Sequence, residues 1–134
     1  MSTLIQPEGW AVPRGYANGV VATGKLLFVG GQIGWNPRSP TPEFPSLTFE
    51  GQFEQALSNV CEVVKAAGGK PEQITRLTIY VTDKKEYLAS LKAIGAAWKK
   101  HLGRHYPAMA LVQVSALVED LAKVEMEATA VLES

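Results

Sequence analysis

Two glutamates near the end of the chain, Glu125 and Glu127, form the acidic pair best suited to acid–base chemistry. They alternate with apolar Val124 and Met126, which predicts a strand with both carboxylates on one face, their Cα atoms ~6.6 Å apart. Two interpretations are open. The pair lies on the solvent-facing side of an edge strand, or on a sheet face that a second subunit covers. In the second case, loss of hydration favours the neutral carboxyl and suits a general base working near neutral pH.

Metal and thiol chemistry have weaker support in the sequence. His101 and His105 lie four residues apart, but Gly103 and Pro107 indicate that the helix has already ended, and no third ligand is indicated by spacing. Solvated histidines at a helix end are favoured, and no metal site is expected. Cys61 falls within the body of a helix, which favours a buried, unreactive thiol.

Nucleotide binding is also disfavoured. The turn Gly30-Gly31-Gln32-Ile33-Gly34 follows a strand, as a phosphate-binding turn does. It leads, however, into a segment with four prolines between positions 37 and 45 rather than into a helix, so no helix N-terminus is available for an anion. A tight turn or a close backbone approach is the favoured interpretation. The sequence contains no GxxxxGK[ST], HExxH or paired CxxC motif.

The elements that must position these residues follow from hydrophobic periodicity. Alternating or continuous apolar runs predict strands over 16–22, 26–31, 73–82, 109–115 and 123–132. Apolar residues at helical spacing predict a helix from Phe49 to Ala67 and a second from Asp83 to Leu102. The expected order is therefore β-β-α-β-α-β-β, with the proline-rich stretch of residues 34–45 as a loop.

This order indicates an α+β fold with one mixed sheet and both helices on the same face. The run of residues 109–114 is apolar on both sides of its strand, so the opposite face of the sheet also requires a cover. A second copy of the chain is the natural candidate. We therefore expect a homo-oligomer with any pocket at the subunit boundary.

Length and composition set the broad class. A chain of 134 residues, 46% hydrophobic and 19% charged, is expected to form a single domain over residues 1–134. Thirteen basic residues balance thirteen acidic ones, which argues against nucleic-acid and anionic-membrane partners. No apolar run reaches the ~18 residues of a membrane span, and no secretory signal is visible. The single cysteine fits a reducing compartment, so a cytoplasmic location is expected.

Several stretches, taken together and in order, resemble the YjgF/YER057c/UK114 family, also called the RidA family. They cover most of the chain: Gly15-Tyr16-Ala17-Asn18-Gly19-Val20, Leu27-Phe28-Val29-Gly30-Gly31-Gln32-Ile33, Gln55 with Asn59, Ile79-Tyr80-Val81-Thr82-Asp83, Tyr106-Pro107-Ala108, and Val124-Glu125-Met126-Glu127-Ala128-Thr129-Ala130.

The resemblance implies a chorismate-mutase-like α+β fold and a homotrimer whose sheets form a central barrel, with three clefts between subunits. It also implies hydrolysis of enamines and imines to a carbonyl compound and ammonia, without a cofactor or metal. The family glutamate that activates the hydrolytic water corresponds to Glu125, and the family tyrosine near the start corresponds to Tyr16. The family serine corresponds to Gly30, so that hydroxyl is lost, while backbone groups of Gly30 and Gly31 remain to orient a substrate.

The largest departure from the family lies at Met109 and Leu111, where the family has an arginine and a cysteine. The family asparagine near Leu91 or Lys92 is also missing. A thioether cannot pair with a carboxylate as a guanidinium does, so a simple 2-imino acid is an unexpected substrate. A neutral or more apolar substrate is expected, or one anchored elsewhere, for which there are four candidates: Arg14, Arg38, Arg104 and Lys123. Trp35 could line such a pocket or serve core or loop packing.

The sequence thus predicts cofactor-independent hydrolysis of an imine, enamine or related C–N bond of a small metabolite in a cleft between subunits. Glu125 would be the base, or a relay shared with Glu127. The alternative is a member of the same family that binds a small metabolite, as a sensor or scavenger, without catalysis.

Overall fold

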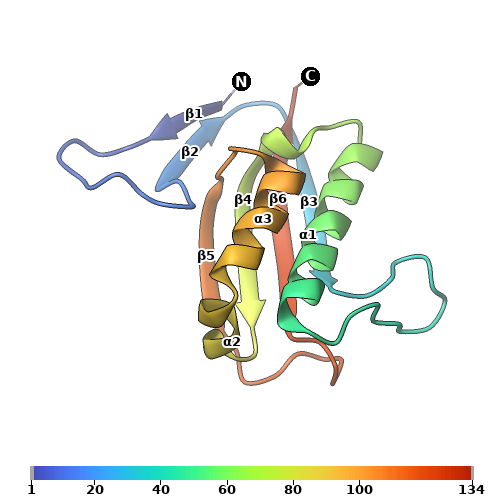
Figure 1. Ribbon diagram of the computed structural model, residues 1–134. Helices are drawn as coiled ribbons and strands as arrows, with labels where there is room; N and C mark the ends of the chain where they lie inside the picture. The colour runs from blue at the N-terminus through green and yellow to red at the C-terminus, as the bar shows by residue number, and fades with distance from the viewer. Residues whose placement is uncertain (1, 134) are drawn as a thin grey trace.

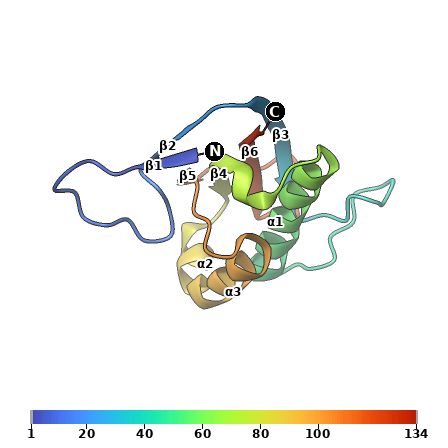
Figure 2. The same ribbon diagram turned by 90° about the horizontal axis from the view of Figure 1, so that it is seen from above.

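The computed structural model describes residues 2–133, which form a four-stranded mixed sheet with its helices on one face (Figures 1 and 2). The strands lie in the order β3 (Lys25–Ile33), β6 (Val124–Leu132), β4 (Ile74–Val81) and β5 (Ala108–Gln113). β6 pairs antiparallel with β3 and β4, and β5 pairs parallel with β4. The predicted α+β class, with a mixed sheet and two main helices on one face, is confirmed.

Helix α1 (Phe49–Ala66) supplies most of the core. Thr48 caps its start, since the hydroxyl accepts a hydrogen bond from the Gly51 N–H. Its apolar stripe packs against β3 and β6, and the residues of β4 that point toward the helices belong to the same core. Most of the largest fully buried side chains are apolar residues of α1, β4 and β6: Phe53, Leu57, Val60, Val64, Ile74, Leu77, Ile79, Val81, Val124 and Met126.

The second predicted helix is two helices, α2 (Lys84–Ala89) and α3 (Leu91–Leu102). Asp83 begins α2 as expected, because its carboxylate accepts a hydrogen bond from the Lys85 N–H. The chain turns at Ser90, whose hydroxyl donates to the Glu86 carbonyl at 2.8 Å. A serine hydroxyl that bonds to a carbonyl of the preceding turn competes with the backbone hydrogen bonds that would continue the helix. α3 then packs beside α1 over the sheet, and a short 3-10 turn, η1 (Pro71–Gln73), precedes β4.

The N-terminal part of the predicted sheet is wrong. The strand expected over 16–22 begins only at Gly19, and this strand, β2 (Gly19–Ala22), pairs with the unpredicted β1 (Ser2–Ile5) in a separate two-stranded sheet. Figures 1 and 2 show this hairpin, with its long connecting loop, projecting from the body. The end of the loop is bonded to the main sheet, since the Ala17 N–H donates to the Pro107 carbonyl at 3.0 Å.

Among residues 2–133, no helix is both long enough and apolar enough to cross a membrane.

Candidate functional site

Glu125 lies on the face of the four-stranded sheet opposite α1 and α3, which we call the open face. Its neighbours Val124 and Met126 are fully buried toward the helices, so Glu125 and Glu127 project from the other side, Glu125 half-buried and Glu127 exposed. The prediction that both glutamates share one face of a strand is confirmed.

A β-bulge on β3 brings glycine backbone directly against the Glu125 carboxylate. The register between β3 and β6 shifts between Val29 and Gln32, so Gly30 and Gly31 lie in the bulge. A Cβ atom added to Gly31 would lie 2.2 Å from Glu125 Oε2, whereas one added to Gly30 would meet nothing within 4 Å. Only glycine at position 31 lets the carboxylate occupy this place. Gly30, Gly31 and Glu125, predicted to act together, are therefore neighbours.

Two buried amides of α1 fix the backbone on both sides of Glu125. The fully buried Gln52 accepts a hydrogen bond from the Lys123 N–H at 2.8 Å and donates to the Leu121 carbonyl at 2.9 Å. Asn59 donates to the carbonyl of Ile33, the register partner of Glu125 on β3, and to that of Trp35. These bonds hold the start of β6 and the end of β3 in place.

Tyr80 is a site neighbour that the sequence analysis did not select. It lies opposite Glu125 on β4, and its hydroxyl donates a hydrogen bond to Glu127 Oε1. This hydrogen bond, with the nearby negative charge of the carboxylates, raises the pKa of Tyr80 above its usual 10.0. The alternation along β4 carried the signal, because it assigns Tyr80 to the face opposite Leu77, Ile79 and Val81.

Tyr16, Met109 and Leu111 meet in a different place, a cavity of about 330 Å³ on the helix side of the sheet. Met109 and Leu111 lie opposite Leu77 and Ile79 on β4, which are buried against the helices. The sheet therefore separates this cavity from Glu125 within one copy of the chain. Predicted site residues are brought together in two groups, not one.

Trp35 belongs to neither group. It is half-buried at the start of the proline-rich loop, where its carbonyl accepts a hydrogen bond from the Asn59 amide at 3.0 Å. It is absent from the lining of the cavity around Met109.

The histidines differ from their predicted solvated state. Both are half-buried with polar partners: His101 Nε2 lies 3.2 Å from Glu54 Oε2, and His105 Nε2 donates to the Ile74 carbonyl at 2.6 Å. Cys61 is buried as predicted, and burial raises its pKa to about 11. Among residues 2–133, no group of three or more His, Cys, Asp or Glu side chains could hold a metal ion.

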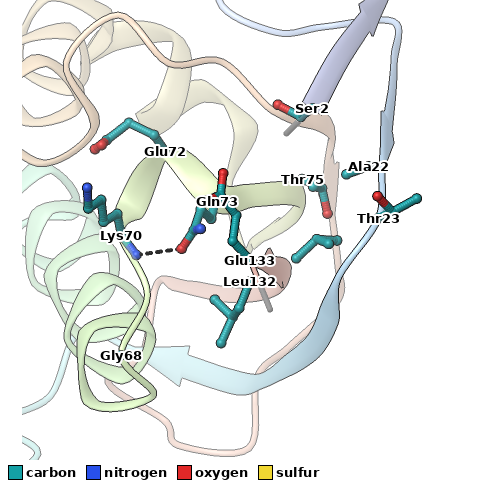
Figure 3. Close-up of a pocket in the computed structure, with 11 residues that line it drawn as sticks. Ser2, Ala22, Thr23, Gly68, Lys70, Glu72, Gln73, Thr75, Leu132 and Glu133 are labelled. Atoms are coloured by element: carbon teal, nitrogen blue, oxygen red, sulfur yellow. Dashed lines mark hydrogen bonds between the residues drawn. The ribbon is translucent and has the colours of Figure 1, made fainter.

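A polar groove of about 480 Å³ lies elsewhere, beside η1 and the end of β6 (Figure 3). Its labelled side chains include Lys70, Glu72 and Gln73, and a hydrogen bond from the Lys70 N–H to Gln73 Oε1 closes the turn at 2.9 Å. None of the predicted site residues lines it.

Known proteins resemble this chain over nearly its whole length. A family model described as Endoribonuclease L-PSP matches residues 10–132. The 2-iminobutanoate/2-iminopropanoate deaminase of Escherichia coli K12 is 35% identical over 132 residues, which cover 98% of each chain. The chloroplastic Reactive Intermediate Deaminase A of Arabidopsis thaliana is 33% identical over 112 residues, which cover 84% of this chain and 56% of the plant protein.

Solved structures also resemble this chain over nearly its whole length. The Rid family protein YyfB of Yersinia pestis, a protein of unknown function, is 30% identical, with a TM-score of 0.84 over 98% of each chain. The Mycobacterium tuberculosis protein Rv2704, a YjgF/YER057c/UK114 member, is 26% identical, with a TM-score of 0.63 over 98% of this chain and 100% of that one. The resemblance inferred from the sequence is thus confirmed: the chain belongs to the Endoribonuclease L-PSP family, together with the RidA and YjgF/YER057c/UK114 proteins.

Proposed function

We propose that the protein hydrolyses an imine or enamine of a small metabolite, without a cofactor, and that Glu125 is the general base. The observation that carries this proposal is the place of Glu125, half-buried on the open face with its carboxylate against the Gly31 backbone. Relatives at about one-third identity are named imine or reactive-intermediate deaminases, which supports the same reaction class.

The reaction needs little machinery. Water adds to the carbon of a protonated imine, the new C–O bond forms as the C=N π electrons move to nitrogen, and Glu125 takes the proton that the water loses. Glu125 then returns this proton to the nitrogen of the resulting amino alcohol. As the hydroxyl loses its proton to Glu125 or water, its oxygen forms the C=O bond, the C–N bond breaks, and ammonia leaves with a carbonyl compound behind. Backbone groups of Gly30 and Gly31 can orient the substrate, and Glu127 can share the proton with Glu125.

We propose that the cleft forms between copies of the chain in a homotrimer. Within one copy, the sheet keeps Tyr16, Met109 and Leu111 away from Glu125, so these residues can serve one substrate only if two copies contribute. The open face supports such an association, because it exposes large apolar side chains around the glutamates, including Leu26 and Phe28.

The proposed substrate has a larger apolar body than a simple 2-imino acid, and any anionic group that it carries must be anchored away from Met109. Met109 is packed against the apolar core and offers no charge to a carboxylate. Burying a carboxylate against Met109 and Leu111 without a partner would cost several kcal/mol.

The alternative, a metabolite-binding member without catalysis, is favoured by two features. Met109 lacks the charge, and Gly30 lacks the hydroxyl, that the sequence resemblance assigns to the reactive cleft. The contact between the Glu125 carboxylate and the Gly31 backbone argues for catalysis. It requires a residue without a side chain at position 31, and a glycine within a strand often marks a place that another group must approach closely.

Imines formed in situ can test the proposal. A flavin amine oxidase converts phenethylamine into neutral phenylacetaldimine, and 2-aminoacrylate provides the small imino-acid case. We expect the protein to accelerate hydrolysis of the neutral imine more than that of 2-aminoacrylate. Glu125→Gln should lower turnover by about 10²-fold or more, as loss of a general base does.

Glu72→Gln, in the groove of Figure 3, is the matched control and should keep full turnover. Unchanged turnover in Glu125→Gln on every imine tested would refute the catalytic role. Tight binding of a metabolite without turnover by the wild-type protein would establish the alternative.

A further inference from the structure

The cavity that contains Met109 has aromatic walls. Phe53, Tyr87, Trp98 and Tyr106 all line it. The Trp98 and Tyr106 rings stack with centroids 6.0 Å apart and planes within 5° of each other. The Trp98 indole N–H is already engaged, since it donates to the His105 carbonyl at 2.9 Å. Phe53 and Trp98 are themselves buried, so the half-buried Tyr87 and the 40% exposed Tyr106 supply the accessible ring surface, which suits a flat apolar body.

Arg14 brings a positive charge to this cavity. It lies in the loop between β1 and β2, followed by Gly15, whose φ of +79° makes the turn that glycine accommodates best. The bond from the Ala17 N–H to the Pro107 carbonyl fixes this stretch beside β5. The backbone at Arg14 is therefore held beside the cavity, while the Arg14 side chain is exposed to solvent.

The guanidinium of Arg14 has no protein partner within residues 2–133, neither a hydrogen bond nor an ion pair. Two of the other basic residues considered as anchors are paired elsewhere: Arg38 with Glu62 at 2.6 Å and Lys123 with Glu86 at 3.1 Å. Arg104 is absent from this cavity's lining. Arg14 alone among the four combines an open guanidinium with a place at the aromatic walls.

We propose that Arg14 binds the anionic group of an amphipathic ligand whose flat, apolar body occupies the aromatic cavity. A guanidinium binds a carboxylate through two parallel charge-assisted hydrogen bonds, and the walls bind the rest by apolar contact. The chemical class is therefore an aromatic or similarly bulky apolar monoanion. As an explanation of substrate choice, this inference rests on the proposed function, which places the substrate beside Met109 in the same cavity.

Calorimetry with two near-isosteric probes tests the charge. Phenylacetate and phenylacetamide share the ring and differ in charge. We expect the wild-type protein to bind phenylacetate about tenfold more tightly, since one charge-assisted contact at an exposed site contributes on the order of 1.4 kcal/mol. Arg14→Gln should remove this preference and leave phenylacetamide binding unchanged. Arg104→Gln, the matched control, should keep it.

A second variant tests the location. Gly95 lines the cavity on α3, and a Cβ added to it meets nothing within 4 Å, so α3 tolerates a side chain there and the leucine of Gly95→Leu should occupy part of the cavity. Both probes should then lose affinity. Equal affinities for the two probes in the wild-type protein, no binding of either, or a preference that survives Arg14→Gln would each overturn the proposal.

This measurement is separate from turnover. If Glu125→Gln keeps full turnover while the phenylacetate preference depends on Arg14, the proposed reaction fails and the ligand site stands. If Glu125→Gln abolishes turnover and Arg14→Gln leaves the preference intact, the reaction stands and the role of Arg14 fails.

Discussion

At the scale of single residues, the contact between Gly31 and Glu125 gives a sharp prediction. The alanine Cβ in Gly31→Ala would lie 2.2 Å from Glu125 Oε2, so one of the two groups must move. The carboxylate is the flexible end of a long side chain, and its movement costs little stability, ~1 kcal/mol or less. Turnover of an imine should still fall at least about tenfold, because the proposed base leaves its position.

Gly19→Ala is a suitable control, because its added Cβ would meet only side-chain atoms of Ile5 at 3.4 Å or more. Thermal unfolding and imine turnover should be measured on both variants. Normal turnover in folded Gly31→Ala would show that the carboxylate position matters less than proposed.

Part of this site could be predicted from the sequence and part could not. Alternation with Val124 and Met126 is local, so it correctly assigned Glu125 and Glu127 to one face. The contact of Glu125 with Gly31 depends on the register between β3 and β6 and on a bulge, which pairing across ~95 residues of chain determines. The separation of Met109 from Glu125 likewise depends on which face of β5 meets the helices.

At the scale of elements, the same distinction holds. Helix α1 was predicted almost to the residue, because its apolar spacing is a local feature. The break at Ser90 was missed, since the apolar stripe continues through it into α3. β1 was missed and β2 was assigned to the wrong sheet, because four-residue strands carry little periodicity and their partner is set by tertiary contacts.

An ion-pair cluster between α1 and α3 gives a pH-dependent prediction. Glu54 Oε2 lies 3.0 Å from Lys100 Nζ and 3.2 Å from His101 Nε2. The hydrogen bond from Lys100, followed by that from His101, lowers the pKa of Glu54 below its usual 4.5. A lowered pKa stabilises the fold above the unfolded-state value, and this stability is lost as pH falls through the lower, folded-state value.

Glu54→Gln should therefore reduce the free energy of unfolding at neutral pH by about 0.5 kcal/mol, a small effect because the pair is partly exposed. The difference from wild type should vanish in acid, below the folded-state pKa of Glu54. Urea unfolding at neutral and acidic pH measures this, with Glu72→Gln as the control. A deficit that persists unchanged in acid would show that lost packing, not charge, is responsible.

At the scale of the whole molecule, no helix among residues 2–133 covers the open face of the sheet. The helices cover one side of the sheet, and on the uncovered side Phe28 is 71% exposed and Leu26 is 60% exposed. Large apolar side chains grouped on one face of a sheet are typical of an interface. Glu125 lies on the same face, so the proposed oligomer and the proposed cleft depend on the same surface.

Phe28→Glu should therefore dissociate the protein, because a carboxylate would have to be buried among apolar groups at the interface. Light scattering at micromolar concentration should give the wild-type protein about three times the 14.5 kDa chain mass and Phe28→Glu a single chain mass. Leu88→Glu, at a 58% exposed residue of α2 on the helix side, should remain trimeric. Dissociated Phe28→Glu should also lose imine turnover, although Glu125 and Gly31 are unchanged, because the proposed cleft takes residues from two copies. A monomeric wild-type protein, or full turnover by the dissociated variant, would contradict a shared site.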